Sequence, residues 1–239
     1  MAARRGRDGP VALRPSARLA GTAGLCLVLL LHAVTATAAQ LLEQTVSERN
    51  DEYRLRVVAL LDASQDYVYR VITDYQHAYR INPAITHISV EPTGRDGALL
   101  VNNRSRHRVG MFSFEVDWRG EVVQHPPGTL IVKTLPHGGS FESGLARWDI
   151  QADGDRTRVV HESVLKPGFP VVPVIGPYLI KRYMREEIVS TFARIECYAR
   201  VLLERDLADD AEQVRVAVHT HQACSRAARQ GGVRAEQPE

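Results

Sequence analysis

The sequence predicts an α+β domain in which a curved antiparallel sheet wraps around one long C-terminal helix. A helical pattern near residues 64–82 is followed by about six strand-like segments with short turns between them, and a second, longer helical pattern ends near residue 205. Short turns between successive strands favour antiparallel pairing. A sheet with one apolar face must cover that face, and the long helix is the only predicted element large enough to do so.

The first 39 residues have the pattern of a secretory signal peptide. Arginines precede an apolar run, LAGTAGLCLVLLLHAV (19–34), and small residues in the segment Ala36–Ala39 then offer cleavage sites. The run is shorter than the roughly 20 apolar residues of a comfortable membrane span, and an uncleaved N-terminal anchor is the alternative. We therefore expect an exported protein, periplasmic or secreted, in which residues 40–51 form a linker.

The distribution of charge argues against a nucleic-acid partner. The whole chain carries +2, but five arginines and one aspartate give residues 1–39 a charge of +4, so the remainder carries −2. A nucleic-acid-binding domain usually has a basic excess, and the exported part of this chain lacks one.

The predicted domain begins with a strand and a helix. Residues 52–61, EYRLRVVALL, start with alternating apolar and polar residues, as in a strand with one covered face. Ser64 is a good N-cap for the helix that follows, in which apolar residues recur three or four apart. Asn82–Pro83 ends this helix, because the residue before a proline is pushed out of helical geometry.

The middle of the chain repeats a pattern of strand and turn. The turn signals are TGRDG, HPPG, PHGG and ADGD. The candidate strands are residues 85–91, 98–109, 112–124, 129–135, 144–151 and 157–165. Aromatic and aliphatic residues from Phe112 to Trp118 alternate with polar ones, so one face of that strand is apolar.

A long amphipathic helix, residues 178–205, follows the irregular segment KPGFPVVPVIGP (166–177). Its apolar stripe includes Met184 and Ile188, which face the sheet whether they serve as core or as ligand contacts. The last residues, 206–239, form a polar tail that is expected to be partly disordered. Cys197 in the helix and Cys224 in the tail either pair in an oxidising compartment or remain free thiols.

Several segments together resemble a known superfamily. They are LLDASQDYVYRVITDYQHAYRINPAI (60–85), FSFEVDWRGEV (112–122), GGSFESGLARWDI (138–150), RTRVVHESVLKPGFPVVP (156–173) and the final helix. On these residues the sequence resembles the START-like helix-grip superfamily, and within it the polyketide cyclase/dehydrase and lipid transport family, which includes coenzyme Q-binding proteins. The resemblance spans residues 52–205. It implies the helix-grip fold and a START-like ligand-binding domain, in a superfamily of lipid carriers, quinone binders and aromatase/cyclases.

No catalytic, metal or cofactor motif stands out. The sequence has no GxSxG, phosphate-binding loop or HExxH pattern, so we predict no catalytic residue, no metal site and no cofactor. His219, His221 and Cys224 have the side chains of metal ligands. In a helix, however, only His221 and Cys224 share a face, and no fourth ligand is near.

Tyr75, His77 and Tyr79 invite an acid–base interpretation. In one continuous helix the two tyrosines share a face, whereas His77 points elsewhere. We therefore expect the tyrosines at the mouth of the ligand space with their hydroxyls in water, and His77 in solvent. The arginines of residues 103–108 form either a solvated outer row, which we favour, or inward partners of an anionic group.

The sequence thus predicts an exported protein that binds or transports a hydrophobic small molecule between the sheet and the C-terminal helix. Lipids, isoprenoid quinones and polyketide-like rings all fit, and a membrane is a further candidate partner. The alternatives are a cyclase or dehydratase acting in the same pocket and an envelope interaction module whose pocket is filled. The candidate ligand-binding residues are Tyr75, Tyr79, Phe114, Trp118, Trp148, Met184 and Ile188. The two tyrosines are expected at the mouth of the pocket, and the other five are plain core residues if they contact no ligand.

Overall fold

The predicted α+β architecture is confirmed by a computed structural model, which describes residues 39–207, except 96, 110 and 111, and residues 223–229. Within them, eight antiparallel strands form one sheet in the order β1-β2-β8-β7-β6-β5-β4-β3. The strands are β1 (Gln40–Arg49), β2 (Glu52–Leu61), β3 (Ile85–Pro92), β4 (Ala98–Val109), β5 (Phe112–His125), β6 (Thr129–Gly139), β7 (Phe141–Asp153) and β8 (Arg156–Pro167). The helices are α1 (Gln65–Thr73), the 3₁₀ helix η1 (Tyr75–Arg80) and α2 (Ile175–Leu207).

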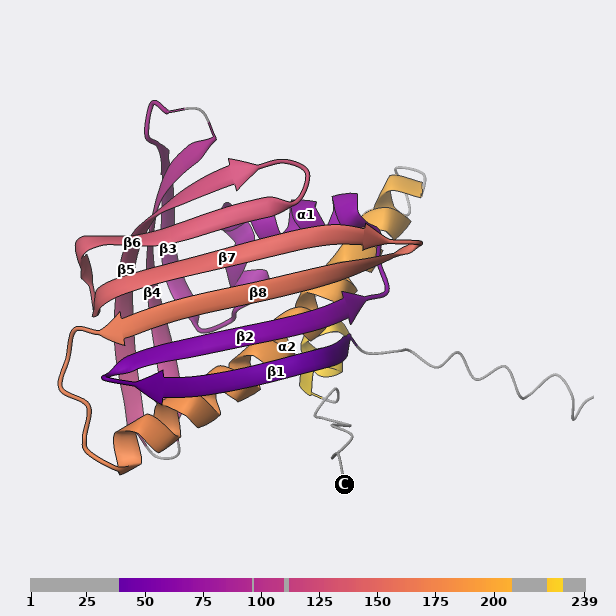
Figure 1. Ribbon diagram of the computed structural model, residues 1–239. Coiled ribbons are helices and arrows are strands. Elements are labelled where there is room, and N and C mark those ends of the chain that lie inside the picture. Colours follow the sequence, from indigo (N-terminus) through magenta and orange to yellow (C-terminus); the bar gives the residue numbers. More distant parts are fainter. Residues whose placement is uncertain (1–38, 96, 110–111, 208–222, 230–239) are drawn as a thin grey trace, which may run out of the picture. The chain divides into compact units, whose positions relative to one another are not determined.

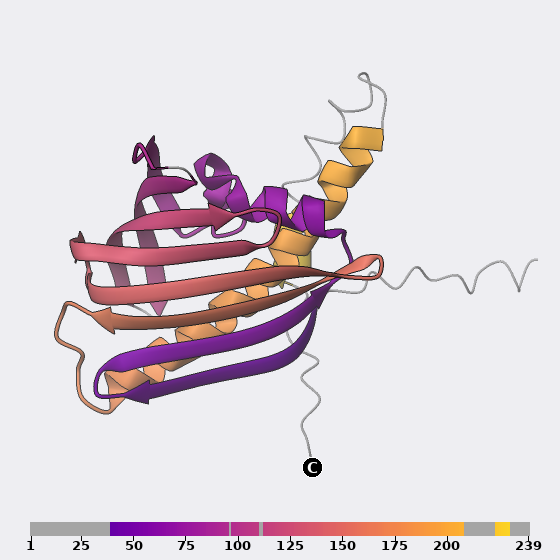
Figure 2. The same cartoon turned by 45° about the horizontal axis from the view of Figure 1, so that its top comes forward.

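The strands β3 to β8 form a continuous meander, and β2 closes it by pairing with β8. The sheet curves, and α2 runs along its inner face while α1 lies beside the C-terminal half of α2 (Figures 1 and 2). Short turns connect the meander strands, as the turn signals of the sequence predicted. This arrangement gives the sheet a solvated outer face and an inner face that α2 partly covers.

Residues 40–51 are not a linker, so that prediction was wrong. They contain β1, which pairs with β2 from Gln40 opposite Leu60 to Arg49 opposite Glu52. The strand is a sheet edge whose outer side chains are polar, so it shows little of the hydrophobic alternation that identifies a strand in a sequence. Its backbone hydrogen bonds to β2 hold it in place.

The first helix is also shorter than the sequence predicted. α1 ends at Thr73, and Asp74 leaves helical geometry with φ −79° and ψ 67° before η1 begins. The Asp74 carboxylate accepts a hydrogen bond from Nδ1 of His77 at 2.8 Å, which satisfies a local polar group in a way that competes with helix continuation. Tyr75 and Tyr79 consequently do not belong to one continuous α-helix.

The hydrophobic core lies between α2, α1 and one half of the sheet. Its largest fully buried side chains include Tyr53 and Val57 of β2, Val159 of β8, and Phe192 and Ile195 of α2. Apolar burial of this kind supplies most of the stabilisation of a domain, at about 25 cal/mol for each Å² removed from water.

Cys197 and Cys224 form a disulfide, with their Cα atoms 5.5 Å apart. This pairing decides between the two alternatives that the sequence left open, and it attaches the helical segment 223–229 to α2. Cys224 therefore offers no thiolate to a metal, while the expected leader, His219 and His221 lie outside the described residues. In the part of the chain that the structure describes, the helices are too short or too polar to span a membrane.

Candidate ligand-binding site

The core fills only part of the inner face of the sheet. The main core cluster takes residues from β2, β6, β7 and β8, and within the described ranges no residue of β3, β4 or β5 joins it, although Val101, Val116 and Val122 of β4 and β5 are themselves buried. The inner face of β4 and β5 is nevertheless rich in side chains that are large or polar. This half of the inner face is the candidate site.

Strand pairing identifies the side chains of that face. Asn103 lies opposite Trp118, and His107 lies opposite Phe114, and directly opposed residues of an antiparallel pair point to the same side. The hydroxyl of Tyr183 on α2 lies 2.5 Å from Nδ1 of His107. These side chains therefore face α2.

His107 is the centre of a polar chain between the sheet and α2. Its Nε2 lies 2.7 Å from Oγ of Ser105, and its ring meets the Tyr183 ring edge to face at a centroid distance of 5.0 Å. Burial lowers the pKa of His107, so the imidazole is neutral near pH 7. A neutral imidazole donates from one nitrogen and accepts at the other. His107 can therefore hydrogen-bond to the hydroxyls of Ser105 and Tyr183 at the same time.

Glu187, one helical turn after Tyr183, continues this chain along α2. Burial, followed by the nearby Glu187 carboxyl, raises the pKa of the Tyr183 hydroxyl. Burial also raises the pKa of the Glu187 carboxyl, against the opposing effects of Arg194 and of a hydrogen bond with Tyr183. The Oε1 atom of Glu187 is buried without a hydrogen-bond partner among the described residues. A buried polar atom of this kind costs about 1–3 kcal/mol unless a partner such as a ligand or water satisfies it.

Trp118 forms the aromatic part of the same face. Its Nε1 donates a hydrogen bond to Oγ1 of Thr134 at 2.9 Å, and a Cβ atom on Gly120 would come within 2.1 Å of the Trp118 ring. The glycine thus lets the indole lie along the strand. Trp118 stays half-buried. It also borders, with Asn103, a hollow of about 400 Å³, but the other lining residues include Asn102, Arg104, Asp117 and Arg119 of the opposite, outer face, so this hollow is not the space between the sheet and α2.

Phe114 lies at the end of this face, 5.6 Å from His107 between ring centroids, and is exposed. The structure therefore brings Phe114 and Trp118 together on one face, as predicted. The arginines of the same strands form a solvated row on the other side, where Arg104 pairs with Asp117 and Arg106 with Glu115.

Trp148, Met184 and Ile188 lie in the core half instead. Met184 and Ile188 are buried within the core cluster, as residues of α2 that face the sheet. Trp148 packs against His161 at 4.1 Å and Phe192 at 5.8 Å between ring centroids. The structure shows that these three residues pack in the core half, and their role as ligand contacts stays a prediction.

Tyr75 and Tyr79 are separated. The Tyr75 hydroxyl accepts a hydrogen bond from Nε2 of Gln124 on β5 at 3.2 Å, and burial raises the pKa of this hydroxyl. The prediction that the Tyr75 hydroxyl lies in water was therefore wrong. Tyr79 is exposed and lines a groove between η1 and the C-terminal half of α2, as does His77.

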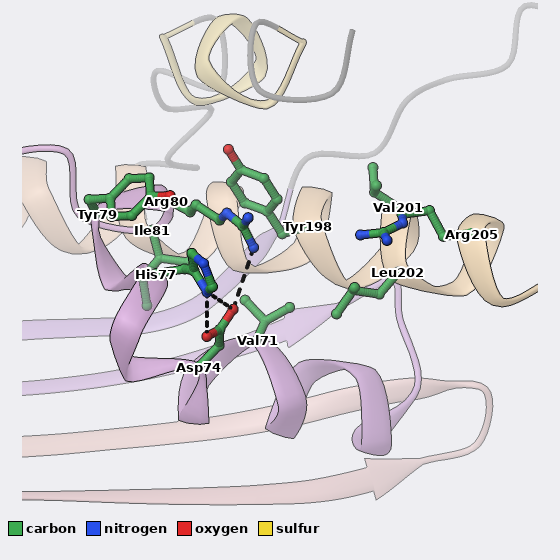
Figure 3. A pocket seen from close by; sticks show the side chains of 10 residues that line it. All are labelled: Val71, Asp74, His77, Tyr79, Arg80, Ile81, Tyr198, Val201, Leu202 and Arg205. Carbon is green, nitrogen blue, oxygen red and sulfur yellow. Dashed lines mark hydrogen bonds and ion pairs between the residues drawn. The ribbon is translucent and has the colours of Figure 1, made fainter. Parts of the chain in front are cut away.

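The groove has a volume of about 290 Å³ (Figure 3). Asp74 lies in its wall and is bonded to His77 at 2.8 Å and to Arg80 at 3.4 Å. The expectation that His77 is simply solvated is thus incomplete, because its ring is held by Asp74. The lining residues are Val71, Asp74, His77, Tyr79, Arg80, Ile81, Tyr198, Val201, Leu202 and Arg205.

Sequence reasoning did not select His107, Tyr183 or Glu187. The available signal was the alternation of Ser105 and His107 with the arginines, which places polar groups on the inner face. A second signal was the spacing of Tyr183 and Glu187 by four residues, next to the apolar stripe of the helix.

Comparisons with known proteins agree with the fold. The sequence model of the family described as "Polyketide cyclase / dehydrase and lipid transport" matches residues 53–200. No match was found among curated protein sequences.

Two solved structures share the fold over most of their length. The Zhui aromatase/cyclase from Streptomyces sp. R1128 has a TM-score of 0.53 and 14% identity, with 63% of this chain and 96% of that chain covered. A STAR-related lipid transfer protein from Xanthomonas axonopodis has a TM-score of 0.52 and 13% identity, with 66% and 98% covered. At these identities the likeness concerns the fold, which is the helix grip.

Proposed function

Because the chain belongs to the polyketide cyclase/dehydrase and lipid transport family, we propose that it binds a hydrophobic small molecule between the inner face of β4 and β5 and helix α2. One observation carries this proposal. Among the described residues, the main core cluster takes no side chain from β3, β4 or β5, and the inner face there holds Trp118 and His107 in a half-buried state beside the buried valines Val101, Val116 and Val122. Concave, mostly apolar surfaces with a few convergent polar groups are the usual ligand sites of proteins.

The ligand in this proposal has an apolar body and one polar end. The apolar body packs on Phe114 and Trp118, and a ligand that buries about 300 Å² of apolar surface gains roughly 7 kcal/mol before the cost of immobilisation. The polar end meets the Tyr183 hydroxyl, because both nitrogens of His107 are bonded to Ser105 and Tyr183; the hydroxyl is free to donate when Nδ1 of His107 carries the proton, and it only accepts in the other tautomer. Lipids, isoprenoid quinones and polyketide-like rings have this composition.

Export is part of the proposal. The leader pattern of residues 1–39 supports it, and so does the disulfide between Cys197 and Cys224, because disulfides persist mainly in oxidising compartments. The protein is then a periplasmic or secreted carrier. N-terminal sequencing of the exported protein tests the cleavage site, and an intact leader would argue for an anchored form.

A ligand-retention experiment tests the proposal. Organic extracts of the purified full-length protein are analysed by mass spectrometry, and added quinone or fatty acid is titrated by quenching of tryptophan fluorescence. Trp118→Ala should lower affinity by tenfold or more, since it removes a large apolar contact. Arg106→Gln, on the outer face of the neighbouring strand, is the matched control and should leave affinity unchanged. A protein that neither retains nor takes up any such molecule would refute the proposal.

A cyclase or dehydratase is the second candidate, favoured by the His107–Tyr183–Glu187 chain. A hydroxyl in contact with a neutral imidazole can donate a hydrogen bond to a developing oxyanion, and a carboxyl with a raised pKa can act as an acid. Tyr183→Phe separates the two functions. An enzyme loses turnover of a poly-β-keto substrate while binding persists, whereas a carrier shows no turnover in either form.

A further inference from the structure

The segment between β8 and the first turns of α2 exposes an unusual concentration of apolar side chains. The exposed fractions are 43% for Phe169, 65% for Val172, 86% for Val174, 60% for Ile175 and 59% for Tyr178. These five residues, here called the apolar loop, lie within ten positions of one another. Isolated exposed apolar residues are ordinary, but a contiguous group marks a surface that contacts something apolar.

The backbone of this loop holds one of these side chains outward at a conformational cost. Val174 has φ 68°, in the left-handed region that β-branched residues rarely adopt. Two backbone hydrogen bonds fix the turn, from Ile175 N to the Pro173 carbonyl at 2.8 Å and from Gly176 N to the Val172 carbonyl at 2.9 Å. Glycine or asparagine would fit this position with less strain. The chain instead places a branched apolar side chain at the most exposed point of the loop.

The charged residues of the segment 166–185 itself are all basic, although Asp51 and Glu52 lie near Lys166. Residues 166–185 contain Lys166, Lys181, Arg182 and Arg185 and no aspartate or glutamate. Lys166 forms an ion pair with Glu142, and Arg182 forms one with Glu186, both at the surface. Exposed ion pairs contribute little free energy, so these basic side chains can exchange their carboxylate partners for others. The segment differs in this from the remainder of the exported part, whose net charge is negative.

From this combination we propose that the apolar loop docks on the surface of an anionic phospholipid membrane. Val172, Val174 and Ile175 insert among the acyl chains, while the basic residues of 166–185 meet the headgroup phosphates. A peripheral protein needs these two contributions together for stable binding, since burial of a few apolar side chains or a few charges alone gives marginal affinity. The proposal does not depend on the identity of any ligand, and its test is separate from that of the proposed binding site.

Local fluorescence on the full-length chain tests this docking. Val174→Cys, in a Cys26→Ser background, carries an environment-sensitive dye, and Leu145→Cys carries the same dye as a control. Leu145 is 53% exposed but lies on β7, outside the apolar loop. Addition of phosphatidylcholine vesicles with about one third phosphatidylglycerol should shift the emission of the 174 dye to the blue and leave the 145 dye unchanged.

Affinity for the same vesicles, measured by sedimentation, supplies the second readout. Replacing Val172 and Ile175 by serine and Val174 by asparagine should lower partitioning at least tenfold without lowering the thermal midpoint, because these side chains are exposed. Replacing Lys181 by glutamine should lower partitioning about fivefold at low salt, since each basic residue near an anionic surface contributes about 1 kcal/mol.

Three results would overturn the proposal. The first is an unchanged emission of the 174 dye with vesicles. The second is an equal shift at position 145, which indicates general adsorption. The third is a shift at position 174 that grows with protein concentration in the absence of vesicles, which means that a second copy of the chain covers the apolar loop.

Discussion

His161 provides a prediction that links acid sensitivity to a single buried side chain. It lies on β8 opposite Val57 and Trp148, with its ring against the Trp148 indole. Burial lowers its pKa from 6.5 to about 4, and Nδ1 has no hydrogen-bond partner among the described residues. The folded protein therefore holds a neutral imidazole.

The sign of the effect follows from proton linkage. In the unfolded chain the imidazole binds a proton as the pH falls below about 6.5, whereas in the folded chain it binds one only near pH 4. The unfolded state binds more protons in this interval, so stability is full above pH 6.5 and falls as the pH decreases toward 4. A difference of roughly 2.5 pKa units corresponds to a loss of about 3 kcal/mol.

Urea unfolding of wild type and His161→Leu at pH 7 and pH 4.5 measures this loss. Other groups, including His107, contribute to the pH dependence of both proteins, so the relevant quantity is the change in their stability difference between the two pH values. It should move by about 2–3 kcal/mol in favour of His161→Leu at the lower pH. Ile150→Val, a non-titrating change on the neighbouring strand, should show the same cost at both. A difference for His161→Leu that is equal at the two pH values would refute the assignment.

Three further perturbations test the packing around the site and the tail. Cys224→Ser should lower the free energy of unfolding by about 3–4 kcal/mol, because the disulfide closes a loop with a sequence separation of 27; urea unfolding without reductant measures it. Phe192→Ala should cost about 3–5 kcal/mol in the same assay, since the ring is fully buried against the core. Gly120→Ala should displace the Trp118 ring, which a tryptophan fluorescence shift reports, and weaken binding of the proposed ligand.

The meander was predictable because its signals are local. Alternating side chains and turn residues such as those of the HPPG and ADGD segments fix strand ends within a few residues, and β4 begins and ends where the pattern does. The long C-terminal helix was predictable for a similar reason, since its apolar stripe repeats over many turns. The expected curved sheet with α2 on its inner face then follows from covering one apolar face.

What escaped prediction depends on contacts between distant residues. β1 is a strand because β2 offers it a free edge, and nothing in its polar outer row indicates this. The break at Asp74 arises because its carboxylate binds His77, and because the Tyr75 hydroxyl meets Gln124, 49 residues away. His107 acquires its role only from Tyr183, 76 residues later in the chain. A sequence pattern shows which face a side chain occupies but not which partner it meets there.

The division of the inner face has a consequence for how stability and binding respond to change. Substitutions at Val57 or Val159 remove fully buried apolar surface and should act mainly on folding. Substitutions at Trp118 or His107 remove half-buried groups outside the main core cluster, and they should act mainly on binding of the proposed ligand. If the proposed site binds a ligand, substitutions in that half of the inner face can change the ligand preference while the main core cluster, and with it the fold, is retained.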